Sequence, residues 1–264
     1  MLAATRQNQI LHLVNLKGSI KVIDLAISLD VSDMTVRRDL DLLARRGLLA
    51  KVHGGATSLS GSSSTEPTFS TKMLRERAIK DSIAREAVRL VEPGMAIALS
   101  GGSTTHALAH YLVDVPGITV VTNSIPAADV LSAAQRDDQT VVLTGGQRTP
   151  SDALVGPVAV STMTNLHVDI LFMGVYGFTT ESGFTTPNLI EAQTNHAMVL
   201  ASKRLIVLAD HTKWGLTGLS TIAQLHEASR IYSDTQLAQD ARGAIANVGC
   251  ELSLVATSGE EAIA

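Results

Sequence analysis

The chain contains little cysteine, few aromatic side chains and no long apolar run. Cys250 is the only cysteine among 264 residues, which excludes an intramolecular disulfide and indicates a reducing compartment. Charged residues, Gly or Pro interrupt each apolar run before it reaches the length of a membrane span. The start, MLAATRQNQI, lacks the apolar core of a secretion signal. We therefore expect a cytoplasmic protein that makes no contact with a membrane.

Metal-binding patterns are also missing from the sequence. The eight histidines include no HExxH pair, and a single cysteine is too few for the usual zinc sites of Cys and His. We expect neither a metal ion nor another cofactor.

Charge is distributed unevenly along the chain, although the net charge is only −4. Residues 1–60 contain eight Lys and Arg against five Asp and Glu, whereas the remainder contains thirteen against twenty. A mildly positive N-terminal part on an acidic body fits contact with nucleic acid at one end of the chain.

A Ser- and Gly-rich stretch, TSLSGSSSTEPT from Thr57 to Thr68, is the strongest linker signal in the chain. We predict an N-terminal domain over residues 1–56, a linker over 57–71 and a second domain over 72–264. This length leaves ample chain for a buried core in the second domain.

Residues 20–56 read IKVIDLAISLDVSDMTVRRDLDLLARRGLLAKVHGGA and carry the densest pattern in the sequence. Apolar residues spaced i, i+3, i+4 and i+7 predict a helix over 21–29. A polar break follows, with Ser32 as the expected N-cap of a second helix. Weak alternation over 48–52 and the glycines after it predict a small hairpin. Together these features predict a winged helix-turn-helix.

The second helix presents Ser32, Thr35, Arg37 and Arg38 near its N-terminus, which is the end that contacts base edges in this motif. Lys51 and His53 on the wing are expected to face the phosphate backbone. A solvated helical hairpin has the same periodicity, so periodicity alone favours neither interpretation.

After the linker, short apolar runs alternate with helical segments, which indicates βαβ units and a largely parallel sheet. The predicted strands fall at 95–99, 119–121, 140–143, 170–173, 205–208, 230–232 and 252–255. The predicted helices fall near 72–91, 103–113, 125–136, 157–165, 190–201 and 235–247.

Small or polar residues follow nearly every predicted strand, at the edge where open α/β sheets bind ligands. The loop 100–105, SGGSTT, joins a strand to a helix, and its glycines and helical N–H groups suit a phosphate. A capped helix that follows a tight turn and binds no ligand has the same kind of sequence. Asp210 and Lys213 have a spacing suited to holding a polar ligand, and an exposed ion pair has that spacing too.

The string VSDMTVRRDLDLLARRGLLAKVHGGA resembles the N-terminal domain of the DeoR family of bacterial transcriptional regulators. The second half is similar to the effector domain of that family, in the segments VVTNS, VVLTGG, DILFMGVYG and DHTKWG. The resemblance implies an α/β domain related to ribose-5-phosphate isomerase and glucosamine-6-phosphate deaminase. It also implies that this domain senses a phosphorylated sugar or a related metabolite. The effector contacts it implies are Gly102, Ser103, Thr104, Asn123, Gly145, Asp169, Glu191, Asp210 and Lys213.

The chain departs from the family pattern at two polar positions. Ser100 stands where the family commonly has Asp, and Asn195 stands where it commonly has Lys. The loss of one anionic and one cationic side chain roughly conserves the local charge. This is compatible with a pocket of altered specificity and equally compatible with a less charged ligand.

The sequence and the resemblance together predict a regulator of carbohydrate-metabolism genes that binds an operator as a homo-oligomer (dimer or tetramer) and responds to a sugar-phosphate-like effector. We expect a repressor, and an activator or a co-repressor response fits the same observations. The main alternative is a sugar-phosphate isomerase or deaminase with an appended DNA-binding module. Because no tight acidic cluster is present, binding without turnover is favoured, and we expect no enzymatic activity. A plain architectural DNA-binding protein is a weaker third possibility.

Overall fold

The computed structural model describes residues 6–7, 9–11, 13–14, 19–46, 48–52, 54–57 and 68–256. The chain divides into two compact units, Met1–Pro67 and Thr68–Ala264. Each unit has a hydrophobic core of its own.

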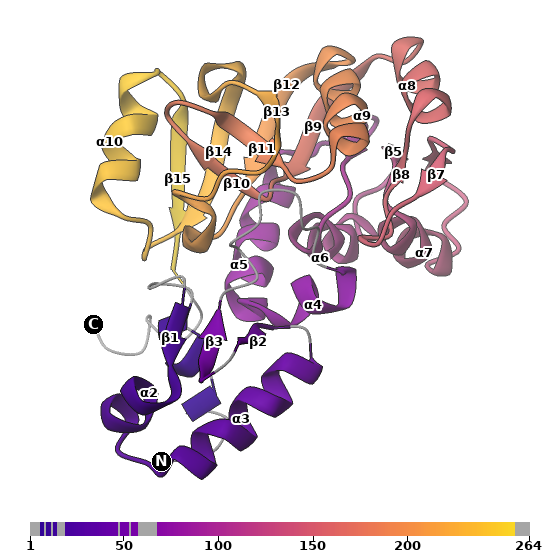
Figure 1. Cartoon of the computed structure of the whole chain (residues 1–264). Helices are drawn as coiled ribbons and strands as arrows, with labels where there is room; N and C mark the ends of the chain where they lie inside the picture. Colours follow the sequence, from indigo (N-terminus) through magenta and orange to yellow (C-terminus); the bar gives the residue numbers. More distant parts are fainter. Residues whose placement is uncertain are drawn as a thin grey trace. The chain divides into compact units, whose positions relative to one another are not determined.

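The first unit combines helices with a small antiparallel sheet (Figure 1). Its elements are β1 (Ser19–Lys21), α2 (Val22–Leu29), α3 (Asp33–Arg45), β2 (Ala50–Val52) and β3 (Gly55–Thr57). The strand order is β1-β3-β2, and the β2–β3 hairpin is the predicted wing. Gly55 must be glycine, because a Cβ there would lie 2.3 Å from the carbonyl oxygen of Ile20.

The bounds of α2 and α3 agree with the predicted helix over 21–29 and the predicted cap at Ser32. Asp30 adopts a left-handed conformation (φ 51°) that ends α2. The Ser32 hydroxyl then accepts a hydrogen bond from the Thr35 N–H at 3.2 Å and caps α3. Val36, Leu40 and Leu43 of α3 are buried, as their spacing requires.

The second unit is built on a seven-stranded, entirely parallel sheet (Figure 1). Its strand order is β15-β14-β12-β9-β4-β5-β6. The strands are β4 (Ala96–Leu99), β5 (Thr119–Thr122), β6 (Thr140–Leu143), β9 (Val168–Gly174), β12 (Ser202–Leu208), β14 (Ala228–Asp234) and β15 (Glu251–Val255).

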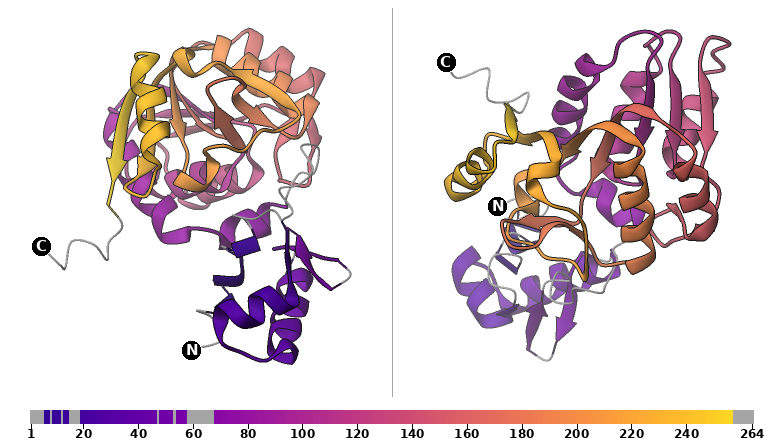
Figure 2. Two further views of the ribbon diagram at one scale, coloured as in Figure 1. Left: turned by 60° about the vertical axis from the view of Figure 1, so that its left-hand side comes forward. Right: turned by 90° about the horizontal axis from the view of Figure 1, so that it is seen from above.

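Helices cover both faces of this sheet, as two views of the ribbon show (Figure 2). One core lies under α5, α6 and α7, and the other lies under α8, α9 and α10. The helices are α4 (Phe69–Leu74), α5 (Arg77–Ala87), η2 (Val88–Leu90), α6 (Ser103–Leu112), α7 (Ile125–Ala133), α8 (Pro157–Thr164), α9 (Leu189–Leu200), η3 (His211–Lys213), η4 (Leu225–Glu227) and α10 (Gln239–Asn247). The predicted class, a winged helix-turn-helix followed by a largely parallel α/β domain, is confirmed.

Two small sheets were not predicted. They consist of β7 (Gln147–Arg148) with β8 (Leu154–Val155), and of β10 (Gly177–Thr179), β11 (Gly183–Thr186) and β13 (Ser220–Ala223). Their strands have two to four residues, which is too short for a periodic pattern to stand out.

The predicted helix over 72–91 is interrupted. α4 starts at Phe69, inside the predicted linker, and ends before Arg75, while Glu76 is left-handed (φ 48°). The Lys80 ammonium donates to the carbonyl oxygens of Lys72 (2.7 Å) and Arg75 (2.5 Å) and so satisfies the C-terminal end of α4.

The order of the strands reverses between β4 and β9. From β4 the chain moves outward to β5 and β6, and it then returns to β9 on the other side of β4 before adding β12, β14 and β15. Such a switch point opens a crevice beyond the carboxyl ends of the strands, where ligands bind in open α/β sheets. No helix among the described residues is long and apolar enough to cross a membrane.

Candidate DNA-binding face and effector site

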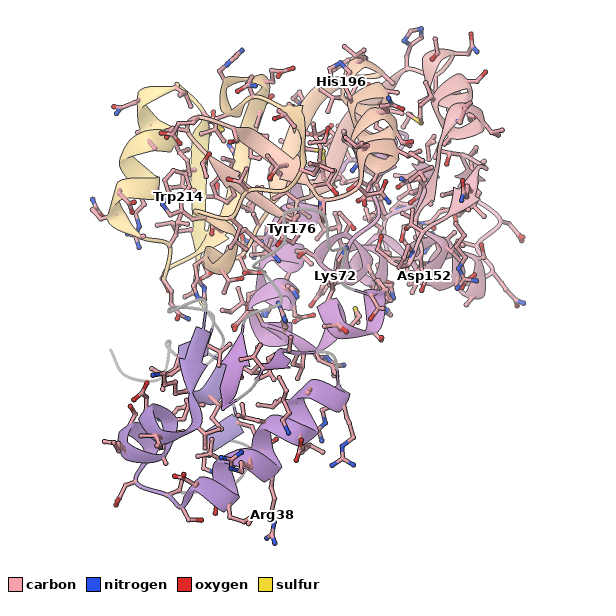
Figure 3. The ribbon with its side chains drawn as sticks, viewed as in Figure 1. Arg38, Lys72, Asp152, Tyr176, His196 and Trp214 are labelled. Atoms are coloured by element: carbon pink, nitrogen blue, oxygen red, sulfur yellow. The ribbon has the colours of Figure 1, made fainter. Side chains whose placement is uncertain are left out.

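The N-terminal turns of α3 form the candidate DNA-binding face. Ser32, Arg37 and Arg38 are exposed and Thr35 is half-buried. Neither arginine makes a hydrogen bond or an ion pair within the described residues, and Figure 3 shows Arg38 projecting from the helix. The Ser32 and Thr35 hydroxyls lie 2.9 Å apart, so part of their hydrogen-bonding capacity is used in the cap.

Asp39 supports this face from behind, a role that the sequence analysis missed. Its carboxylate accepts from Arg6 Nε at 2.6 Å and from Gln7 Nε2 at 2.9 Å, and it is buried. The ion pair joins α3 to the helical residues that precede β1, and so it fixes the orientation of α3 in the unit. An Asp on the apolar side of an amphipathic helix was the available sequence signal.

Lys51, predicted to contact phosphate, pairs with the Asp41 carboxylate of α3 at 2.5 Å. Both side chains are about half exposed, so the pair joins the wing to α3 at a modest gain. The hydrogen bond from Lys51 is also the main cause that lowers the pKa of Asp41. His53 lies outside the described residues.

The loop from β4 to α6 lies at the switch point of the larger sheet. Ser100 Oγ accepts a hydrogen bond from the Gly174 N–H at 3.1 Å, which ties the loop to the end of β9. A Cβ on Gly102 would lie 3.7 Å from the Cα of Gly174. α6 has no side-chain cap at its start, so the first N–H groups of the helix, near Ser103 and Thr104, remain available to an anion.

Asn123, which directly follows β5, lies beside the loop from β4 to α6. Its Oδ1 accepts from the Gly101 N–H at 2.7 Å, while its Nδ2, fully buried, has no hydrogen-bond partner among the described residues. Gly145, with φ +72°, lies just beyond β6, two strands away from the switch point. The structure therefore brings Gly102, Ser103, Thr104 and Asn123 together and places Gly145 at the same sheet edge.

A buried charge cluster continues this edge at the end of β12. Burial opposes the ionisation of Asp210, yet Lys213, Lys80 and a hydrogen bond from Thr212 together lower the pKa of Asp210. Burial lowers the pKa of Lys80 to about 8 and also lowers the pKa values of Lys213 and Arg75. Three cations, Arg75, Lys80 and Lys213, thus act on the buried Asp210 carboxylate, and the exposed Glu76 adds a second negative charge near Lys80 and Lys213.

The sequence analysis did not include Arg75 and Lys80 in this site. Lys80 falls on the apolar face of α5 with Ile83, Ala84 and Ala87, so a lysine at a core-facing position was the signal. Tyr176, just beyond β9, is a second addition, because its phenol interacts electrostatically with Arg75. Figure 3 shows Tyr176 and Lys72 at one edge of the α/β unit.

His211 and Asp234 form an ion pair next to this cluster. His211 Nδ1 lies 2.9 Å from an Asp234 carboxylate oxygen, and Asp234 is fully buried. The hydrogen bond to Asp234 raises the pKa of His211. Asp234 also accepts from the backbone N–H groups of His211 and Gln236, so its capacity is used within the fold.

Helix α9 contributes buried polar residues in its first two turns. Glu191 is buried in the first turn, and Asn195 follows one turn later, 1% exposed. Both amide atoms of Asn195 lack a hydrogen-bond partner among the described residues. Thr194 accepts from the Gly156 N–H at 3.1 Å, which ties this part of α9 to the end of β8.

Asp169 does not join the other predicted effector residues, and the prediction that groups it with them is corrected. It follows the first residue of β9, at the amino end of the strand, whereas the switch-point residues lie at the carboxyl ends. Its carboxylate accepts from the Ala96 N–H at 3.0 Å and from Lys203 Nζ at 2.8 Å. Asp169 is close in sequence to Gly174, the last residue of β9, but the seven-residue strand places these two residues at opposite ends.

The described residues contain no cluster of His, Cys, Asp and Glu that fits a metal ion. Cys250 is buried, and burial raises the pKa of its thiol to about 11, which makes it unreactive at neutral pH.

The fold and these two sites define a class of protein: a DNA-binding helix-turn-helix joined to an α/β ligand-sensing domain. Residues 6–62 match the model of the DeoR-like helix-turn-helix domain, and residues 75–235 match that of the DeoR C terminal sensor domain. The chain belongs to the DeoR family of transcriptional regulators.

Curated relatives match this chain along nearly its whole length. The chain is 34% identical to the HTH-type transcriptional regulator GolR of Listeria innocua, over 88% of this chain and 91% of that protein. It is 31% identical to a putative aga operon transcriptional repressor of Escherichia coli O157:H7, over 95% and 93%. It is 34% identical to a lactose phosphotransferase system repressor of Staphylococcus aureus, over 87% and 91%. A D-ribose-5-phosphate isomerase structure in complex with phospho-erythronic acid matches 53% of this chain and 54% of that one at 18% identity and a TM-score of 0.39.

Proposed function

We propose that this chain represses genes of carbohydrate metabolism and that a phosphorylated sugar or a related metabolite changes its affinity for the operator. Two of the relatives are named as repressors, one of the aga operon and one of the lactose phosphotransferase system. Winged helix-turn-helix domains use the second helix of the motif to read the major groove.

The DNA-binding half of the proposal rests on α3. Arg37 and Arg38 have guanidinium groups free to reach guanine edges or phosphates, and Ser32 and Thr35 lie at the end of the helix that enters the groove. Lys51 is positioned by Asp41 and, together with His53, is proposed to contact the phosphate backbone.

The effector half rests on one observation. The uncapped start of α6 lies at the switch point, in the same sheet edge as the cations Arg75, Lys80 and Lys213 around Asp210. Free N–H groups at a helix N-terminus and nearby cations both favour a phosphate. The buried amides of Asn123 and Asn195 add hydrogen-bonding groups suited to sugar hydroxyls.

Binding without turnover is the second part of the proposal. An isomerase or deaminase needs a base positioned at a carbon next to a carbonyl group. Asp210 is a weak base, because neighbouring cations and Thr212 lower its pKa, and Asp169 is at the other end of its strand. Aldose–ketose exchange by the purified protein that disappears in Asp210→Asn would favour the enzyme instead.

We further propose that the protein acts in the cytoplasm as a dimer or tetramer. One recognition helix contacts few base pairs, and helix-turn-helix proteins reach their specificity by binding two half-sites.

A thermal-shift panel tests the effector assignment most directly. Pentose and hexose phosphates are compared with the parent sugars and with inorganic phosphate. We expect stabilisation by a subset of the phosphates and none by the matching free sugars. A ligand that binds only the folded protein, at a concentration 100 times its Kd, raises the free energy of unfolding by about 2.7 kcal/mol. A melting curve resolves a change of this size. Stabilisation by free sugars alone would contradict the phosphate assignment.

A further inference from the structure

The chain changes direction between α4 and α5, although its local sequence favours one helix. Residues 69–87 contain neither Gly nor Pro, and the periodicity of this region predicts a continuous helix. Instead α4 ends at Leu74, α5 begins at Arg77, and the two helices run in different directions (Figure 1). Glu76 between them is left-handed (φ 48°), a conformation that is uncommon for residues other than Gly, Asn and Asp. Contacts from outside this segment therefore hold the break.

The Lys80 ammonium takes the place of two hydrogen bonds that a continuous helix would contain. It donates to the carbonyl oxygens of Lys72 (2.7 Å) and Arg75 (2.5 Å). In a continuous helix these two oxygens would accept from the N–H groups four residues later, those of Glu76 and Ile79. The same two carbonyl groups are thus satisfied in either arrangement, broken or continuous.

The start of α4 is held by loops of the candidate effector site. The ring of Phe69 packs edge-on against the imidazole of His106 on α6, with the ring centroids 5.3 Å apart. The His106 N–H closes the first turn of α6 by donating to the Gly102 carbonyl at 3.0 Å. The Phe69 N–H donates to the carbonyl of Pro150, between β7 and β8, at 3.4 Å. A change in the first turn of α6 therefore acts directly on α4.

The break also determines which cations lie together. Arg75 and Lys80 both interact electrostatically with the buried Asp210. Side chains five residues apart point about 140° away from each other around a continuous helix, so a continuous helix would turn one of these cations away from Asp210. An anion that interacts with both cations therefore binds the broken arrangement more tightly. By that difference in affinity it shifts the balance between the two arrangements.

We propose that the break between α4 and α5 is a two-state switch: an anionic effector stabilises the break, and without the effector the break exchanges with a continuous helix over residues 69–87. This step rests on the proposed function, because it takes the effector to be an anion bound near α6 and Asp210. Along the chain, α4 is the first described element after the DNA-binding unit. The direction of α4 therefore determines where the chain to that unit leaves the α/β unit.

Substitutions at Glu76 test the switch by hydrogen exchange on the full-length protein without a ligand. Glu76→Gly favours the left-handed conformation and thus the break, whereas Glu76→Ala favours a continuous helix, and both remove the same carboxylate. A continuous helix adds hydrogen bonds at the N–H groups of residues 76–79, which otherwise begin α5. We expect protection factors for these amides that are roughly fivefold or more higher in Glu76→Ala than in Glu76→Gly. Equal protection in the two variants would overturn the proposal.

Glu86→Gly and Glu86→Ala form the matched control pair. Glu86 lies in the last turn of α5, which is helical in both arrangements, so these substitutions leave the balance between the arrangements unchanged. We expect the protection of residues 76–79 to be the same in both. A difference as large as that between the Glu76 variants would mean that these amides report only the stability of α5, and it would contradict the switch.

Inorganic phosphate probes the part that the anion plays. In Glu76→Ala we expect phosphate to lower the protection of residues 76–79 roughly fivefold, because it favours the broken arrangement. Sodium chloride at the same ionic strength is expected to have no such effect. Protection that phosphate raises or leaves unchanged would show that the anion does not select the break.

Operator binding separates this proposal from the proposed function. Without a ligand, Glu76→Gly and Glu76→Ala are expected to differ roughly fivefold or more in operator affinity by fluorescence anisotropy, while the two Glu86 variants bind equally. Different protection with equal operator affinity would overturn the link between the break and DNA binding. If neither the wild type nor any variant binds an operator fragment, the proposed function fails, and the exchange measurements still decide whether the break is a switch.

Discussion

At the scale of single residues, Arg38 gives the clearest prediction for DNA binding. Its guanidinium is exposed and has no ion-pair partner within the described residues, so Arg38→Ala is expected to remove the proposed DNA contact without removing support for the fold. We expect operator binding to weaken by about 1–3 kcal/mol in fluorescence anisotropy. Effector-induced thermal stabilisation stays unchanged, and Arg89→Ala on the α/β unit is the control. An equal loss of both activities would show that Arg38 supports folding instead.

Asn195 gives a prediction about the effector site. Its buried amide has no hydrogen-bond partner among the described residues, and an unsatisfied buried polar group costs about 1–3 kcal/mol. Asn195→Leu is therefore expected to raise the melting temperature of the ligand-free protein and to reduce the shift produced by the effector. Asn165→Leu, at an exposed position, changes neither. A destabilised variant with a full effector response would show that the amide serves the fold.

His211 gives a prediction about pH. Its hydrogen bond with Asp234 raises its pKa, so the stabilisation from this pair is fully present below the unfolded pKa of about 6.5. That stabilisation is lost as pH rises through the folded pKa. His211→Gln is expected to lower the melting temperature more at pH 6 than at pH 9. Equal losses at both values would mean that the neutral imidazole makes the same contribution.

At the scale of elements, two ion pairs hold α3 in different ways. Asp39 is buried and bonded to Arg6 and Gln7, whereas Asp41 pairs with Lys51 at an exposed position. Removing one partner of a buried pair costs about 3–5 kcal/mol, while an exposed pair contributes roughly 0–1 kcal/mol. Asp39→Ala should therefore destabilise the N-terminal unit strongly in urea and Asp41→Ala hardly at all. Similar effects from both would contradict this account.

The first helical segment of the α/β unit shows how one element depends on a contact remote in sequence. The periodicity of residues 72–91 favours a single helix, yet the chain breaks at Glu76. The Lys80 ammonium stabilises this break by donating to two carbonyl groups of the turn before it. As a result, Arg75 leaves the helix and takes part in the charge cluster with Asp210.

At the scale of the whole molecule, the effector site and the DNA-binding face are expected to be coupled. A typical coupling of about 1–3 kcal/mol changes operator affinity roughly 5–150-fold. Thr104→Val should abolish this response and leave operator binding without effector unchanged, because Thr104 lies at the start of α6 in the α/β unit. Thr217→Val in an exposed loop is the control. Retention of the full response by Thr104→Val would exclude α6 as the phosphate site.

The sequence by itself determined α2, α3 and the strands of the large sheet with most of its helices, but neither the two small sheets nor the break between α4 and α5. The spacing of Val22, Leu25 and Leu29, the cap at Ser32 and the alternating strands and helices after residue 72 all have local causes. Periodicity and capping act within a few residues of the chain, so they can be seen without a fold. The parallel sheet was predicted on this basis, whereas the family and the candidate residues at the carboxyl edge of the sheet were predicted from the resemblance of the motifs.

The tertiary structure decided which of these residues meet. It separated Asp169 from the switch point because the residue lies at the opposite end of β9, and it added Arg75 and Lys80 through the break between α4 and α5. Strand order also places β9 beside β4, although many residues separate them in the chain. Such contacts depend on how segments distant in the sequence pack together, and this packing cannot be predicted from a local pattern of residues.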